Sequence, residues 1–238
     1  MDQATAIEPR PSVRRASLGS ILVLGAATVV ALWFLMTFAL PYLTLDPQRF
    51  GPYWPRRSWL LLYITSAMVA LLVGPAQLWL GLTRQRLRLH RRLGTGYMAS
   101  VVISAMAALY LVFHTELGWV FGMGLVGLAI AWIVTTGLAF VAIRRRMIDQ
   151  HKEWMIRSYV MTFAFVTFRI LFGILGVAGV GTTSEQLAAA SWFCWAVPLL
   201  VTEALLQGRK IFAAKPRHRA NAQERAAHAL RWPLCKAR

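Results

Sequence analysis

The sequence predicts an all-α protein that crosses a lipid bilayer as a transmembrane bundle of about six helices. Three observations support this fold class. Of the 238 residues, 58% are hydrophobic and only 15% are charged, whereas soluble domains carry about 25% charged residues. Long uncharged runs alternate with short arginine-rich segments. This alternation is typical of a chain folded in lipid.

Six apolar runs define the expected spans. A helix rising about 1.5 Å per residue needs about 20 residues to cross a hydrocarbon core about 30 Å thick. The first five runs meet that length, whereas the sixth is shorter and contains Pro198. The runs are Leu18–Leu40, Ser58–Leu82, Thr95–Phe113, Phe121–Ile143, Ser158–Val180 and Ser191–Gln207.

The basic residues predict the orientation of the bundle. With the N-terminus inside, 22 of the 26 Lys and Arg residues lie on the cytoplasmic side, three lie outside and one, Arg169, lies within a span. The positive-inside rule therefore predicts both ends in the cytoplasm, and the expected location is an inner membrane. The expected organisation is a cytoplasmic arm at 1–17, the bundle at 18–207 and a basic cytoplasmic tail at 208–238.

The expected partners also follow from the charge. The net charge of +17 would suggest nucleic acid in a soluble protein, but topology alone accounts for these basic residues. The predicted partner is the lipid bilayer, with anionic headgroups at the basic loops and tail. No nucleic-acid partner is expected.

A weak repeat favours a four-helix core formed by spans two to five. The segments Arg84–Met98 and Arg144–Met161 each place a basic cluster before a histidine and then a span. His90 and His151 align at a separation of 61 residues. This pattern is typical of two related helix hairpins, although the positive-inside rule alone could produce it.

Arg169 is the candidate around which we expect a polar interior site. It lies 11 residues from either end of the fifth run, where a charge costs about 2.5 kcal/mol or more and normally faces the bundle interior. A stripe at helical spacing, which includes Thr162, supports an interior face. The expected partners are Glu203 and Gln77. The alternatives for Arg169 are an anion or propionate site, a coupling switch, and a structural ion pair.

His90 and His151 are candidate ligands of a haem b or a metal ion. We expect them at one depth on facing helices, where neutral imidazoles can ligate iron. The alternative is that both are interfacial histidines that bind nothing. Gly122, Gly124 and Gly127 match a dinucleotide-binding motif, but no strand precedes them, so close helix packing is the better interpretation.

Two motifs give the chain a resemblance to a known family. They are His90-Arg-Arg-Leu-Gly94 with Tyr97, and His151-Lys-Glu-Trp-Met155 with Arg157, Ser158, Tyr159 and Thr167-Phe-Arg169. The pattern resembles the predicted bacterial membrane proteins with domain of unknown function 2306, over Ser58–Gln207. The resemblance implies no established activity. The family core looks like cytochrome b561-type haem bundles at the level of fold alone, and this chain lacks the four in-span histidines that two haems need.

The sequence therefore favours a non-enzymatic, multi-pass membrane protein with a polar interior site at Arg169. No nucleophile elbow, P-loop or zinc-protease motif is present. Two alternatives stay open at this point. One is a b-type haem electron carrier that uses His90 and His151, and the other is a transporter of small molecules or ions.

Overall fold

The computed structural model describes residues 17–84 and 86–213, and all regular structure within these ranges is helical. The expected N-terminal arm and basic tail lie almost entirely outside the described residues. Residues 1–199 form one unit and 200–238 a second. The long helices are α1 (Leu18–Phe34), α3 (Arg57–Thr83), α4 (Leu87–Val112), α5 (Trp119–Arg144), α6 (Ile148–Val177) and α7 (Thr183–Ala213).

The six predicted spans are confirmed, because six helices within the described residues are long and apolar enough to cross a bilayer. The helices extend beyond the apolar runs at several ends. Helices α4 and α6 begin in the arginine-rich segments, since Arg, Leu and Met favour helix even outside an apolar environment. Helix α7 is continuous through Pro198, so the sixth span is longer than its apolar run.

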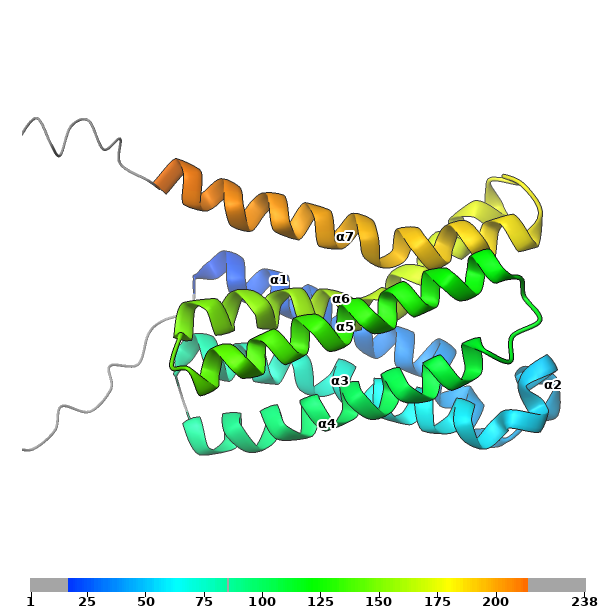
Figure 1. Ribbon diagram of the computed structural model, residues 1–238, viewed down its shortest axis with the longest axis horizontal. Coiled ribbons are helices and arrows are strands. Elements are labelled where there is room, and N and C mark those ends of the chain that lie inside the picture. Colours follow the sequence, from blue (N-terminus) through cyan, green and yellow to red (C-terminus); the bar gives the residue numbers. More distant parts are fainter. Residues whose placement is uncertain (1–16, 85, 214–238) are drawn as a thin grey trace, which may run out of the picture. The chain divides into compact units, whose positions relative to one another are not determined.

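A series of short helical turns connects α1 to α3. A π-helical turn, η1 (Leu35–Ala39), continues α1 and leads into the 3₁₀ turn η2 (Leu40–Thr44). Helix α2 (Pro47–Phe50) follows, with the Asp46 carboxylate accepting a hydrogen bond from the Gln48 N–H at 3.0 Å. The 3₁₀ turn η3 (Gly51–Arg56) completes the connection. These turns lie at the end of the first unit that the charge distribution predicts to face outward (Figure 1), and we call it the outer end.

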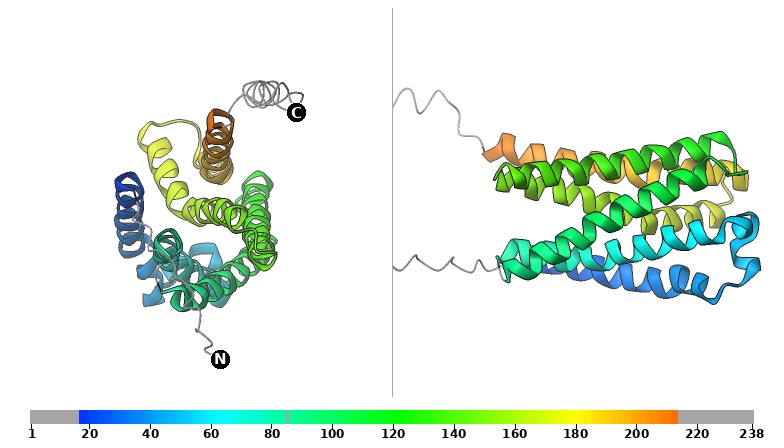
Figure 2. Two further views of the ribbon diagram at one scale, coloured as in Figure 1. Left: turned by 90° about the vertical axis from the view of Figure 1, so that its left-hand side faces the viewer. Right: turned by 60° about the horizontal axis from the view of Figure 1, so that its bottom comes forward.

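Spans two to five form the predicted four-helix core. Helix α3 packs against α4, α5 packs against α6, and the two hairpins meet through α4 with α5 and through α3 with α6. Figure 2 shows these four helices side by side in the end-on view. Helix α1 packs on α3 and α6. The connections from α3 to α4 and from α5 to α6 lie at the opposite, arginine-rich end (Figure 1), which we call the inner end.

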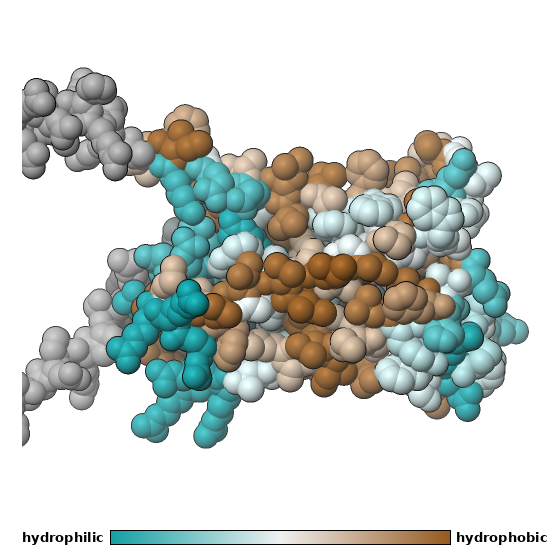
Figure 3. All heavy atoms as spheres, viewed as in Figure 1, coloured by the Kyte–Doolittle hydropathy of each residue, from teal (hydrophilic) through white to brown (hydrophobic). Residues whose placement is uncertain are grey.

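Large apolar side chains cover the outside of the core helices. Val102, Ile103 and Met106 are exposed on α4, and Ile130 and Val134 are exposed on α5. Figure 3 shows a band of hydrophobic side chains over these two helices, with hydrophilic side chains gathered at both ends. A soluble monomer rarely exposes so continuous an apolar surface. Lipid is the environment in which this surface is favourable.

Glycines on α5 allow α7 to approach closely, which confirms the close-packing interpretation of the glycine motif. A Cβ atom at Gly124 would lie 2.9 Å from the backbone carbon of Ser191, and one at Gly127 would lie 2.8 Å from the Trp195 ring. The indole N–H groups of Trp192 and Trp195 donate to the carbonyls of Val120 and Gly124, each at 3.1 Å. These bonds fix the first half of α7 against α5.

Candidate functional site

A cavity of about 390 Å³ lies in the outer half of the first unit. All six long helices of that unit and the turns between α1 and α3 contribute to its wall. Its size falls within the range of small-molecule sites, about 300–1,000 Å³. Its wall is mainly aromatic and aliphatic, and the polar side chains that line it are Tyr42, Arg49, Tyr53, Tyr63, Arg169 and Cys194.

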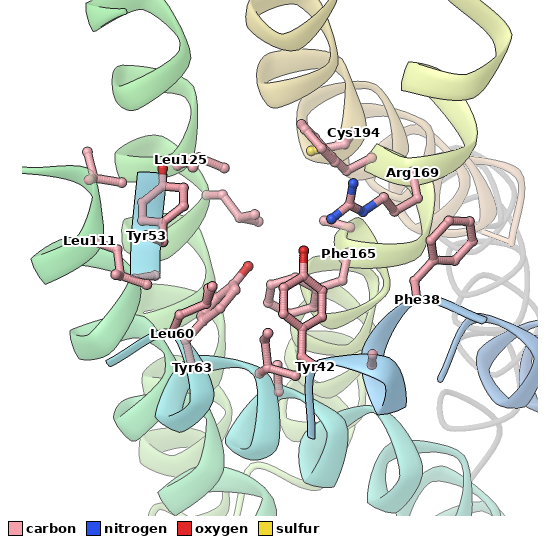
Figure 4. A pocket seen from close by; sticks show the side chains of 18 of the residues that line it. Phe38, Tyr42, Tyr53, Leu60, Tyr63, Leu111, Leu125, Phe165, Arg169 and Cys194 are labelled. Atoms are coloured by element: carbon pink, nitrogen blue, oxygen red, sulfur yellow. The ribbon is translucent and has the colours of Figure 1, made fainter. Parts of the chain in front are cut away.

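Arg169 directs its guanidinium group into this cavity (Figure 4). Two aromatic rings hold it, with the guanidinium carbon 5.8 Å from the Phe38 ring centre and 6.0 Å from that of Phe168. Within the described residues of the first unit, no carboxylate lies at ion-pair distance from Arg169: the pairs there are Arg49–Asp46, Lys152–Asp149 and Arg157–Glu153. Cation–π contacts offset only part of the desolvation of such a charge.

Three tyrosines accompany Arg169. Figure 4 shows the hydroxyl groups of Tyr42 and Tyr63 directed into the same space as the guanidinium. The Tyr53 hydroxyl lies 2.8 Å from Thr115 Oγ1, which ties the η3 turn to the loop after α4. A tyrosine hydroxyl donates as well as accepts. The cavity therefore presents convergent donors to any acceptor group that enters it.

The inner end of the cavity is apolar and lined by small side chains. Ala105, Ala129 and Ala164 line it and are 1–3% exposed. Trp132 closes this end, and its ring lies 5.2 Å from that of Phe165. Along α5, Phe121 and Trp132 both line the cavity, so it extends about 16 Å along the helix axis at 1.5 Å per residue.

Thr162 belongs to a different feature, a cluster of buried hydroxyl groups in the middle of the bundle. The Tyr97 hydroxyl lies 2.8 Å from Ser158 Oγ and 2.7 Å from Thr162 Oγ1. Thr136 Oγ1 lies 2.6 Å from Ser158 Oγ, and the Trp132 N–H donates to Thr162 Oγ1 at 3.0 Å. The cluster joins α4, α5 and α6. Thr162 is two helical turns from Arg169 and does not line the cavity.

Replacing Tyr97 with Phe is expected to lower the free energy of unfolding by about 1 kcal/mol, because Ser158 and Thr162 each lose a partner inside the bilayer. Thermal unfolding of the purified protein measures this change. Tyr110→Phe is the control, since the Tyr110 hydroxyl bonds to no described residue and its ring stacks on Trp59 at 4.3 Å. Equal stability of the two variants would show that the cluster contributes nothing.

Gln77 bonds to His90 at the inner end of the bundle and not to Arg169. The His90 Nδ1–H donates to the Gln77 carbonyl at 3.2 Å, and the Gln77 amide N–H donates to His90 Nε2 at 3.5 Å. Gln77 is 4% exposed, and its Oε1 accepts no hydrogen bond from any described residue. Both nitrogens of His90 are thus engaged by one residue of α3.

His151 repeats this arrangement in the second hairpin. Its Nδ1–H donates to the Ala139 carbonyl at 2.8 Å, so each histidine is bound to the preceding helix of its own hairpin. Tyr97 and Ser158, also 61 residues apart, meet in the hydroxyl cluster, which places the two hairpins in register. A backbone-bonded Nδ1 is also found in metal-ligating histidines. However, neither His90 nor His151 lines the cavity. The side-chain amide of Gln77 also bonds to His90 Nε2, the atom that would ligate a metal.

Glu203 lies on the part of α7 that belongs to the second unit. There it accepts a hydrogen bond from the Gln207 amide at 2.6 Å. Its pairing with Arg169 stays a prediction. Among the described residues, no group of three or more His, Cys, Asp or Glu side chains could hold a metal ion.

The sequence analysis did not select the aromatic residues of the site. Tyr42, Tyr53 and Tyr63 all line the cavity. Trp132 donates a hydrogen bond to Thr162 and also lines the cavity. An aromatic side chain looks the same in a sequence whether it faces lipid or an internal space, so only the packing distinguishes the two.

These features define a class of protein: a multi-pass helical membrane protein with an internal cavity into which Arg169 projects. The chain belongs to the family of predicted membrane proteins with domain of unknown function 2306, which matches residues 60–206. This match confirms the resemblance inferred from the His90 and His151 motifs. Comparison with curated proteins and with solved structures gives no match.

Proposed function

We propose that this protein binds a small lipophilic molecule within the membrane, in the cavity around Arg169, and that it does so without catalysing a reaction. The observation that carries the proposal is the guanidinium group, which projects into the cavity and forms no ion pair within the described first unit. An apolar pocket with a few convergent polar groups is the usual form of a small-molecule site.

The chemistry of the wall supports this function over a purely structural role for Arg169. A structural arginine in a span is normally paired with a carboxylate or with backbone carbonyls. Here the guanidinium carbon lies within 6.0 Å of the ring centres of Phe38 and Phe168, and the group projects into the cavity. A ligand that carries an acceptor oxygen would complete the hydrogen bonds of the guanidinium, while its apolar part would occupy the alanine-lined inner end.

Ala164→Phe tests the proposal by filling the inner end of the cavity. We expect the variant to fold and to lose a co-purifying ligand, because a benzyl group would occupy the space that an apolar ligand needs. Native mass spectrometry of the protein extracted in mild detergent measures the bound small molecule. The expected result is a wild-type adduct that is reduced at least tenfold in Ala164→Phe.

The matched control is Ala26→Phe, which adds the same group to the exposed surface of α1. This control should keep the adduct at the wild-type level. If the wild-type protein carries no adduct and takes none up from lipid extracts, or if both variants keep the adduct, the cavity is not a ligand site.

We also propose that the chain lies in a bacterial inner membrane with both ends in the cytoplasm, and that its inner end binds anionic headgroups. The turn between α3 and α4 gathers Arg84, Arg86, Arg88 and Arg92 around a surface hollow. The next inner turn adds Arg144–Arg146. Each basic residue near an anionic leaflet contributes about 1 kcal/mol of attraction, which supports this orientation.

A further inference from the structure

We propose that the ligand of the Arg169 cavity is a single-chain amphiphile with a carboxylate head, bound with its head at Arg169 and its chain toward Trp132. This inference rests on the proposed function, since it names the chemical class of the molecule bound there. It follows from the charge, the donors and the polarity gradient of the cavity.

The charge lining the cavity favours a monoanion. Two arginines line the wall, Arg49 and Arg169. The Arg49 Nε atom lies 3.9 Å from an Asp46 carboxylate oxygen, so its charge is offset locally. Arg169 contributes one positive charge without a carboxylate in the described first unit. A ligand with one negative charge neutralises it, and a guanidinium binds a carboxylate with two parallel hydrogen bonds.

The donors around Arg169 fit a carboxylate better than a cationic or neutral head. The hydroxyl groups of Tyr42 and Tyr63 point into the same space (Figure 4), and each can donate to a carboxylate oxygen. No acidic side chain lines the cavity within the described residues. An ammonium head would therefore meet like charge there, and an alcohol would leave the guanidinium charge uncompensated.

The polarity gradient sets the direction of the chain. Arg169 lies two helical turns beyond Thr162 toward the outer end, and Trp132 bonds to Thr162. The space from Arg169 to Trp132 is therefore about 10 Å long at 1.5 Å per residue. It is lined by Ala129, Ala164 and Phe165. A chain in this space lies among apolar side chains, as it does among lipid tails, so the chain sets the direction of binding and the head at Arg169 sets the selectivity.

The test uses full-length protein in nanodiscs of zwitterionic lipid, with dodecanoate labelled with ¹³C at the carboxyl carbon as the probe. We expect a saturable, protein-dependent ¹³C signal, distinct from that of dodecanoate dissolved in the bilayer. Unlabelled dodecanoate should displace it, whereas dodecan-1-ol and dodecylamine should require at least a tenfold higher concentration. Ala164→Phe should abolish the signal, and Ala26→Phe should retain it.

The outcomes separate this inference from the proposed function. Displacement by the alcohol or the amine at the same concentration as dodecanoate would leave a lipophilic site in place and overturn the carboxylate assignment. A signal that survives in Ala164→Phe would place the bound carboxylate outside the cavity and overturn the assignment as well. If none of the three probes binds to the wild-type protein in a saturable way, both proposals fail.

Discussion

Replacing Arg169 with Leu is expected to weaken anion binding at least tenfold while raising the stability of the protein. Loss of a charge-assisted contact corresponds to about 1.5–3 kcal/mol, or tenfold to more than a hundredfold in affinity. The same change removes a cation that has no carboxylate partner in the described first unit, so the unfolding midpoint should rise by about 2–4 °C, the shift that about 1 kcal/mol produces. Titration with labelled dodecanoate and thermal unfolding measure the two effects.

Arg169→Lys distinguishes a bidentate site from a simple positive charge. Lysine keeps the charge but offers a point contact in place of the two-pronged guanidinium, so we expect only partial recovery of binding. Equal affinity of the Lys variant and the wild type would argue against a bidentate contact. The control is Arg145→Leu at the inner turn, which should leave dodecanoate affinity unchanged.

A fall in stability in Arg169→Leu would instead point to a structural ion pair. The sequence predicts Glu203 as the partner, and a double-mutant cycle with Glu203→Gln decides this. A coupling free energy above about 1 kcal/mol in unfolding would establish the pair. In that case the guanidinium would serve the fold, and the binding proposal would lose its main support.

Gly124→Ala is expected to destabilise the bundle strongly for a change of a single methyl group. The added Cβ would lie 2.9 Å from the backbone carbon of Ser191 and would also meet the Ser191 side chain. Backbone cannot move aside as a flexible side chain can, so α5 and α7 must separate, at a cost of about 1–3 kcal/mol. The Trp195 bond to the Gly124 carbonyl would lengthen at the same time. Thermal unfolding and folded yield in detergent report the change.

Gly137→Ala on the same helix is the matched control. A Cβ at Gly137 meets nothing within 4 Å, and alanine favours helix over glycine by up to about 1 kcal/mol. We therefore expect this variant to be neutral or slightly more stable than the wild type. Equal destabilisation by the two changes would mean that the contact between α5 and α7 at Ser191 contributes nothing to stability.

The positions of single residues were harder to predict than the spans. The sequence selected Arg169 as an interior side chain, because a charge within an apolar run is unfavourable against lipid, and Arg169 lines the cavity. It grouped Arg169 with Gln77 and Thr162, whereas Gln77 pairs with His90 and Thr162 joins the hydroxyl cluster. The spacing of residues along a helix predicts which face of the helix each one occupies. It does not predict which residue of a neighbouring helix packs against that face.

The sequence by itself determined the number of spans, the apolar core of each span, the four-helix core and the family. Each of these depends on local composition, because the bilayer imposes one length and one polarity on every span. The tertiary structure alone decided that Tyr42, Tyr63 and Arg169 face one cavity and that His90 and His151 each bond to the preceding helix. Such contacts depend on how the helices are rotated and how far apart they pack, and apolar residues in lipid carry little information about either.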